Sequence, residues 1–262
     1  QRDKTFPTLD CSACVLSPRM AQVSNHPLIR LMVYSEVEEV SGYIGNFNIK
    51  VRSRARYVDE AKCTSCGLCV EKCPVKVPNE FNDGLDTRKA IYIPFPQAVP
   101  NTPVIDKVNC TYFKNGKCRA CEKFCAPEAI VFDQQDEISE IEVGAVIIAT
   151  GYDLFDPSII THYGYRRYDN VFTANEFERM VGSTGPTNGR ILMKSDQPPQ
   201  SVAIVHCVGS RDRNYHEYCS RVCCMNALKF AHQVRTNLPE ADIYNFYIDI
   251  RSFGKGYEEF YK

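Results

Sequence analysis

Residues 63–74 read CTSCGLCVEKCP, which spaces four cysteines as C-x2-C-x2-C-x3-C and places Pro74 directly after the fourth. Three thiolates two residues apart can wrap a tight loop around one iron–sulfur cubane, while the fourth, ahead of the proline, points away toward a second cluster. Gly67 allows the backbone to curl close to inorganic sulfide. The stretch therefore predicts a segment that folds around metal clusters.

A second run follows at residues 110–127, with the spacing C-x7-C-x2-C-x3-C-A-P, so only its first gap is longer. In two-cluster ferredoxins the fourth cysteine of each run binds the other cluster. This rule predicts one [4Fe–4S] site at Cys63, Cys66, Cys69 and Cys125, and another at Cys110, Cys118, Cys121 and Cys73. Structural zinc also takes four thiolates, but its sites usually pair two C-x2-C knuckles. Two triple runs favour iron–sulfur, and a zinc-stabilised interaction module is the alternative.

The composition of the 262 residues is that of an ordinary globular protein, apart from its 14 cysteines. A formal net charge of -1 and a pI near 6.6 suggest neither a nucleic-acid binder nor a polybasic membrane binder. No apolar stretch approaches the length of a membrane span, and residues 1–10 lack a secretion signal. We therefore expect a reduced, cytoplasmic metalloprotein. Because the chain does not begin with Met, we expect a processed product or a piece of a longer protein.

The amino-acid composition and the hydrophobic pattern of the sequence change at Tyr57 and again after Asp133. Residues 57–133 are dense in Cys, Pro, Asn and Gly, which favours a small module stabilised by metal. Residues 47–55 alternate apolar and polar side chains, as a strand does, and strand-like sequence resumes from Ile138 to Ala149. The simplest interpretation is an α/β domain of residues 1–56 and 134–262 with a cysteine-rich module, 57–133, inserted into it.

Several further elements are predicted from pattern. Residues 176–181 and 218–234 are expected to be helices, and residues 201–207 and 243–250 strands. An apolar run at 28–34 belongs to the strand-and-turn region before the module. A row of arginines in the 48–56 strand is either a docking patch or, by default, a solvated strand face.

The last four cysteines form a C-x11-C-x3-C-C pattern: Cys207, Cys219, Cys223 and Cys224. Cys219 and Cys223 are four residues apart and would share a helix face, whereas Cys224 is turned by about 100° from Cys223. Binding of one cluster then requires a bent backbone or a cluster that caps the helix. On spacing alone, buried inert cysteines or a redox dithiol are favoured over a cluster.

Cys11 and Cys14 form a separate C-x2-C pair. The pair is a redox dithiol, half of a metal site completed by another chain, or a buried structural pair, and the sequence favours the last. A thiol–disulfide oxidoreductase that uses Cys11 and Cys14, or Cys223 and Cys224, is therefore the rival enzyme hypothesis.

Longer motifs carry a resemblance to one family, the A subunits of heterodisulfide reductase. They are CTSCGLCVEKCP, RKAIYIPFPQAVP (88–100), AVIIATGYDLFDP (145–157), CVGSRD (207–212), YCSRVCCMNALK (218–229) and DIRSFGKGYEEFY (249–261). The resemblance runs from residue 35 to the last residue. It implies an iron–sulfur flavoprotein with a thioredoxin-reductase-like FAD domain, an inserted two-cluster ferredoxin module and a third [4Fe–4S] cluster, here at Cys207, Cys219, Cys223 and Cys224.

The family also implies partners. A hydrogenase or formate dehydrogenase partner would deliver electron pairs at FAD, which are split between ferredoxin and B- and C-type heterodisulfide reductase subunits. This chain has no G-x-G-x-x-G after a strand, so the dinucleotide fingerprint is expected upstream of Gln1. What remains of a flavin site is predicted at Thr150 and Gly151, which resemble a strand-end turn of FAD-dependent disulfide reductases, and at Lys229, facing the flavin. The alternatives are an ordinary strand-to-loop turn at Thr150 and Gly151, and a solvated side chain at Lys229. No catalytic acid, base or nucleophile is expected.

Overall fold

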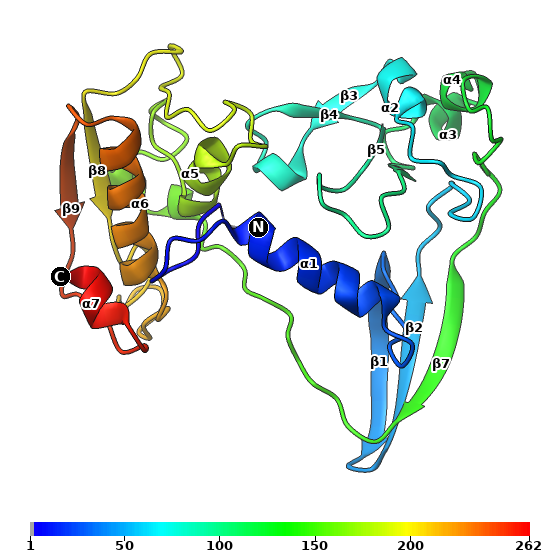
Figure 1. Ribbon diagram of the computed structural model, residues 1–262, viewed down its shortest axis with the longest axis horizontal. Coiled ribbons are helices and arrows are strands. Elements are labelled where there is room, and N and C mark those ends of the chain that lie inside the picture. The colour runs from blue at the N-terminus through cyan, green and yellow to red at the C-terminus, as the bar shows by residue number, and fades with distance from the viewer. Residues whose placement is uncertain (1–2) are drawn as a thin grey trace. The chain divides into compact units, whose positions relative to one another are not determined.

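The computed structural model describes residues 3–262, whose contacts divide into two compact units (Figure 1). The central unit comprises Ser17–Tyr152, and the terminal unit comprises the described residues up to Leu16 together with Asp153–Lys262. Helix α1 (Ser12–Asn25) spans the boundary between the two ranges. Both units mix helices and strands, which confirms a mixed α/β chain. The thioredoxin-reductase-like part of the expected fold, and the predicted boundaries at 56/57 and 133/134, stay predictions.

The central unit contains a three-stranded antiparallel sheet in the order β1-β2-β7, made of β1 (Ser35–Tyr43), β2 (Asn46–Ser53) and β7 (Glu137–Val143). A two-residue turn joins β1 to β2, and its Gly45 has a φ of +92°, which favours glycine. Strands β2 and β7 flank the cysteine-rich segment in sequence and pair from Phe47 opposite Val143 to Ser53 opposite Glu137. Their pairing brings the two ends of that segment together (Figure 1).

The alternation predicted for residues 47–55 is confirmed by β2. The arginine row, however, is neither bare nor fully solvated. Arg54 pairs with Glu36, Arg52 pairs with Glu38, and Arg56 is buried with its guanidinium donating to the carbonyl of Thr102 at 3.2 Å. Carboxylates of the same sheet neutralise Arg52 and Arg54. The row therefore offers little net positive charge with which to dock a partner.

The elements between β2 and β7 are short. They are α2 (Leu68–Lys72), β3 (Lys76–Pro78), η1 (Glu80–Asn82), β4 (Thr87–Lys89), β5 (Ile91–Tyr92), β6 (Val104–Ile105), α3 (Thr111–Asn115) and α4 (Ala120–Lys123). Strand β3 pairs with β4 and β5 with β6, both antiparallel. The core of this region mixes apolar side chains such as Val58, Ile91 and Ile105 with buried cysteines. A core that includes thiols leaves part of the stabilisation to bound metal.

The terminal unit is built on a parallel strand pair with a connecting helix: β8 (Ser201–Val205), α6 (Cys223–Asn237) and β9 (Asp242–Phe246). Met180, Val181, Ile191 and Val234 form its buried apolar cluster. The remaining elements are η2 (Pro157–Ile159), η3 (Thr161–Tyr163), α5 (Ala174–Val181) and α7 (Tyr257–Tyr261). A capping box starts α5, because Thr173 and Glu176 each accept the other's backbone N–H.

The predicted strands and helices of this unit are found with altered ends. Helix α6 begins at Cys223 rather than at Tyr218, because Arg221 has a φ of +68°, which a helix cannot contain. The strand predicted for 243–250 ends at Phe246.

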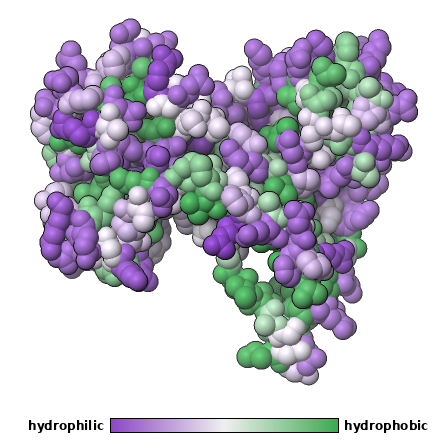
Figure 2. Space-filling model, in the orientation of Figure 1, coloured by the Kyte–Doolittle hydropathy of each residue, from purple (hydrophilic) through white to green (hydrophobic). Residues whose placement is uncertain are grey.

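Two apolar runs form no strand. Leu28 is 88% exposed, and β7 ends at Val143, which leaves Ile147 92% exposed. An apolar run becomes a strand only where a neighbour pairs with it, and neither run has one among residues 3–262. Green side chains also lie where β1 turns into β2 (Figure 2). Ile44, in the turn between these strands, is 88% exposed. Over the described range, every helix is too short or too polar to span a bilayer.

Candidate iron–sulfur sites

The first candidate site is a small cavity in the central unit that is partly open to solvent. Its cysteines are Cys63, Cys66, Cys69 and Cys125. Gly67, with a φ of +79°, turns the chain directly before α2 begins, so the loop curls as the sequence requires. Its other walls are mostly apolar, with Val58 and Ile130 among them, and include the polar Thr64 and Ser65.

Backbone amides point at two of these thiols. The N–H of Ser65 donates to Sγ of Cys63 at 3.4 Å, and the N–H of Ala129 donates to Sγ of Cys125 at 3.3 Å. Hydrogen bonds to cluster sulfur are one of the means by which a protein sets a cluster's potential.

The second candidate site is a similar cavity, lined by Cys73, Cys110, Cys118 and Cys121. Ile91 and Ile105 of the paired strands β5 and β6 close its apolar side. The fourth cysteine of each run thus lies in the cavity of the other run, which is the exchange that the spacing predicts. Ligation by these eight thiols stays a prediction, but the structure gathers them in the predicted foursomes.

The donor set of each cavity fits an iron–sulfur cluster. Each cavity is lined by four thiols, and four cysteine thiolates are the ligands of a [4Fe–4S] cluster. Across residues 3–262, no three His, Cys, Asp or Glu side chains are placed to hold a single metal ion.

The deepest thiols need metal to lose their protons. Burial raises the pKa of Cys69 to about 11 and that of Cys121 to about 12. Only the thiolate binds iron, so binding must displace these protons. A thiol that stays protonated at neutral pH is a poor nucleophile, which separates these cysteines from a reactive dithiol.

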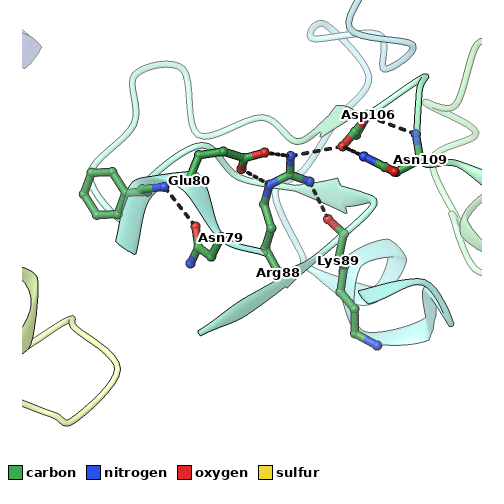
Figure 3. Close-up of polar contacts among 7 residues, drawn as sticks. Asn79, Glu80, Arg88, Lys89, Asp106 and Asn109 are labelled. Atoms are coloured by element: carbon green, nitrogen blue, oxygen red, sulfur yellow. Dashed lines mark hydrogen bonds and ion pairs between the residues drawn. The ribbon is translucent and has the colours of Figure 1, made fainter. Parts of the chain in front are cut away.

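A buried arginine holds the loop that leads into the second cavity (Figure 3). The guanidinium of Arg88 donates to both carboxylate oxygens of Glu80, at 2.5 and 2.6 Å, and to Asp106 at 3.0 Å. Asp106 also accepts from the side chain of Asn109, and its carbonyl accepts the N–H of Cys110 at 2.9 Å. The arginine therefore positions the turn that presents Cys110.

Lys89, which follows Arg88 in the sequence, supports the second cavity at Cys73. The Nζ of Lys89 donates to the carbonyl of Cys73 at 2.5 Å, which also places a positive charge beside this cavity. Sequence reasoning did not assign a role to Arg88 or Lys89. The signal was present, because both begin the stretch RKAIYIPFPQAVP that carries the resemblance.

The third set of cysteines gathers in the terminal unit between β8 and α6. Burial, with a further contribution from the Cys223 thiol, raises the pKa of Cys207. Burial also raises the pKa of Cys224, to which Cys223 and Cys219 add. The four thiols are thus electrostatic neighbours. Because α6 begins at Cys223, the prediction that Cys219 and Cys223 share a helix face is wrong, and Cys219 approaches from the preceding loop.

Charged side chains lie beside this set. Arg211 is hydrogen-bonded to Cys207 and pairs with Asp249 at 2.5 Å. The carbonyl of Asp249 is also 3.8 Å from Sγ of Cys224. A guanidinium next to a thiol favours the thiolate that a metal needs.

Comparisons with known proteins agree with this geometry. Residues 56–79, which contain the first cysteine run, match a family described as a 4Fe-4S binding domain. The chain is 51% identical over 264 residues to the A subunit of the H(2):CoB-CoM heterodisulfide,ferredoxin reductase of Methanothermobacter marburgensis, covering 100% of the chain and 39% of that relative. It is 50% identical to the iron-sulfur A subunit of the CoB--CoM heterodisulfide reductase of Methanocaldococcus jannaschii, with the same coverage. The chain belongs to the family of heterodisulfide reductase A subunits.

A third member, the A subunit of the Ferredoxin:CoB-CoM heterodisulfide reductase of Methanosarcina mazei, is 48% identical over 262 residues, which cover 99% of the chain and 32% of that relative. The chain therefore spans about two fifths or less of the length of these relatives. The family is one of oxidoreductase components.

The predicted flavin contacts are divided between the two units, with Thr150 and Gly151 in the central unit and Lys229 in the terminal unit. Thr150 and Gly151 are exposed in a segment without helix or strand. Lys229 is fully buried, and its Nζ lies 2.5 Å from the carboxylate of the buried Glu178. The alternative of a solvated lysine is therefore wrong. A flavin role for these residues stays a prediction for a longer chain of this family.

The favoured interpretation of Cys11 and Cys14 as a buried pair is also wrong. Cys14 is exposed and Cys11 is half-buried. They stand at the start of α1, where few apolar side chains are available to cover them.

Proposed function

We propose that this chain is the iron–sulfur electron-transfer part of a protein like the heterodisulfide reductase A subunits. The observation that carries the proposal is the pair of cavities, each lined by four cysteines and each taking one cysteine from the other's run. When bound, a [4Fe–4S] cluster supplies a one-electron redox centre. The chain's part is to hold the thiolates, exclude water and adjust the local charge.

The exchange of cysteines links the two sites through a short covalent path. Helix α2 carries Cys69 at the first cavity and ends directly before Cys73 at the second. The second run makes the same link in reverse, from Cys121 to Cys125. Two redox sites joined in this way are close enough for outer-sphere electron transfer through the protein, with no need for an acid, base or nucleophile.

We extend the proposal to a third [4Fe–4S] site at Cys207, Cys219, Cys223 and Cys224. What supports it is the electrostatic proximity of the four thiols and the adjoining Arg211. In the complete protein, we propose exchange of electrons with ferredoxin and with H2- or formate-linked partners, since names of the relatives include these. Flavin-based bifurcation and B- and C-type partner subunits belong to the same proposal.

The test is the iron content of matched cysteine variants, purified without oxygen. Cys125→Ser is expected to remove one cluster's iron and sulfide from the first cavity, and Cys224→Ser one cluster's iron from the third set. Cys14→Ser serves as the control and is expected to change neither. Zinc in place of iron, or full iron content in Cys125→Ser, would overturn the proposal for the central unit. Full iron content in Cys224→Ser would remove only the third site.

A further inference from the structure

The C-x2-C pair at the start of α1 has the geometry of a reactive dithiol. Cys11 directly precedes the helix and Cys14 lies in its first turn, with the two Sγ atoms 2.7 Å apart. The N–H of Cys14 also donates to Sγ of Cys11 at 3.3 Å. Both cysteines lie in the terminal unit and outside the three proposed cluster sites.

Hydrogen bonds within the terminal unit hold the segment that carries the two cysteines. Cys11 forms an antiparallel bridge with Lys4, and the N–H of Ser12 donates to the carbonyl of Asp3 at 2.9 Å. Asp3 in turn donates its N–H to Glu178 at 2.6 Å, and the Nζ of Lys229 lies 3.4 Å from the carbonyl of Lys4. The buried Lys229–Glu178 pair thus anchors a short loop whose outer end presents the thiols.

The surroundings make the two thiols unequal. The hydrogen bond from the Cys14 thiol, its backbone N–H and the charge of Lys4 lower the pKa of Cys11. The same hydrogen bond raises the pKa of Cys14, which acts as the donor. A helix N-terminus further favours a thiolate at this position. Cys11 is thus the more acidic thiol and the one expected to attack a disulfide first. Cys14 lies beside it as the second thiol of the pair.

The spacing of the two sulfurs does not fit a tetrahedral zinc site. The 2.7 Å between them is shorter than the about 3.8 Å that two thiolates on one tetrahedral zinc would keep.

We propose that Cys11 and Cys14 are a redox-active dithiol that undergoes thiol–disulfide exchange with an external disulfide, a function beyond the cluster-based electron transfer proposed above. The Cys11 thiolate attacks one sulfur of the substrate disulfide, forming a mixed disulfide and releasing the first thiol. The Cys14 thiolate then attacks Sγ of Cys11, which releases the second thiol and closes a Cys11–Cys14 disulfide. Two electrons and two protons pass from the dithiol to the substrate, whose S–S bond is broken.

The experiment uses the cluster-loaded protein in anaerobic buffers of reduced and oxidised glutathione at varied ratios. After alkylation and trypsin digestion, both cysteines fall in one peptide, residues 5–19, which contains no other cysteine. We expect this peptide to convert from a doubly alkylated form to one with an internal disulfide, which carries no alkyl group and is two hydrogens lighter than the unmodified dithiol peptide, in a single two-electron transition. The visible absorbance of the clusters is expected to stay unchanged.

Single variants test the assignment of roles. Cys14→Ser is expected to accumulate glutathione on Cys11, whereas Cys11→Ser should label Cys14 more slowly, because its thiol is the less acidic. A peptide that stays doubly alkylated at every ratio would overturn the dithiol. So would a peptide that resists alkylation until iron is chelated, since that would identify metal ligands. Equal labelling of the two variants would overturn the order of attack. None of these outcomes bears on the iron content of the other twelve cysteines.

Discussion

Replacing Arg88 by Met should loosen the second cluster site and leave the first intact. The arginine side chain is 8% exposed, and its charge is shared between Glu80, which is 69% exposed, and Asp106, which is 12% exposed. The guanidinium also lies 3.8 Å from the centre of the Tyr92 ring. Methionine preserves much of the volume but leaves the buried carboxylate of Asp106 without its cation.

The magnitude follows from the exposure of each partner. Breaking a buried pair costs about 3–5 kcal/mol, whereas an exposed pair contributes at most about 1 kcal/mol. Asp106 keeps its hydrogen bonds from Asn109, at 2.9 and 3.1 Å, which places the loss near the lower figure, about 3 kcal/mol. Since about 1.4 kcal/mol is a tenfold change in an equilibrium constant, local opening around Cys110 should rise roughly a hundredfold.

The assay is the rate of iron loss to a chelator under anaerobic conditions, followed by alkylation to identify the cysteines that are released. In Arg88→Met, we expect Cys110, Cys118 and Cys121 to be alkylated in a fast phase. Glu80→Gln is the matched control, because it removes only the exposed pair and should change the rate by less than about fivefold. Equal effects of the two substitutions, or simultaneous release of Cys63 and Cys66, would refute the reasoning.

Three further outcomes are expected. Lys229→Met should destabilise the terminal unit by about 3–5 kcal/mol in denaturant unfolding, because it leaves the buried Glu178 without its cation. A double variant, Lys229→Met with Glu178→Leu, should recover most of that loss of stability. If it recovers none, the broken ion pair is not the cause of the loss. Lys89→Gln should lower the potential of one cluster, seen in a redox titration, by on the order of 50 mV, since about 1.4 kcal/mol is about 59 mV for one electron; an unchanged potential would exclude the electrostatic role. A hydrogen bond from the N–H of Ala55 holds the pKa of Asp136 below its ordinary value, so its contribution to stability exists above about pH 4 and disappears as the pH falls through the lowered pKa. Asp136→Asn should therefore lower the melting temperature at pH 7 and converge with the parent protein in acid, and a constant difference at all pH values would contradict this.

The cysteine foursomes could be predicted from sequence because spacing constrains a short chain that must encircle a cubane. Cys73 and Cys125 were assigned to opposite sites by the exchange rule alone, and both lie in the cavities so predicted. The strands at 46–53 and 201–205 were equally visible, since alternation and buried apolar runs depend on local pattern.

The sequence-based predictions that failed depended on contacts between residues distant in sequence or on unusual backbone conformations. The apolar run at 145–149 has the composition of a strand, but composition does not supply the neighbour that a strand must pair with. The start of α6 was misplaced because the positive φ of Arg221 cannot be foreseen from a residue type that rarely adopts it. The alternative of a solvated Lys229 failed because its partner, Glu178, lies 51 residues away in sequence.

The buried Lys229–Glu178 pair connects these observations. A buried ion pair is rarely the most stable choice, since apolar residues of similar volume often serve as well or better. Here both charged groups also hold the backbone that leads to Cys11, through the N–H of Asp3 and the carbonyl of Lys4. An apolar replacement could restore the packing but would supply neither hydrogen bond. The double variant should therefore regain stability while the two-electron transition of the Cys11–Cys14 peptide broadens or shifts, and an unchanged transition would show that the dithiol does not depend on this anchor.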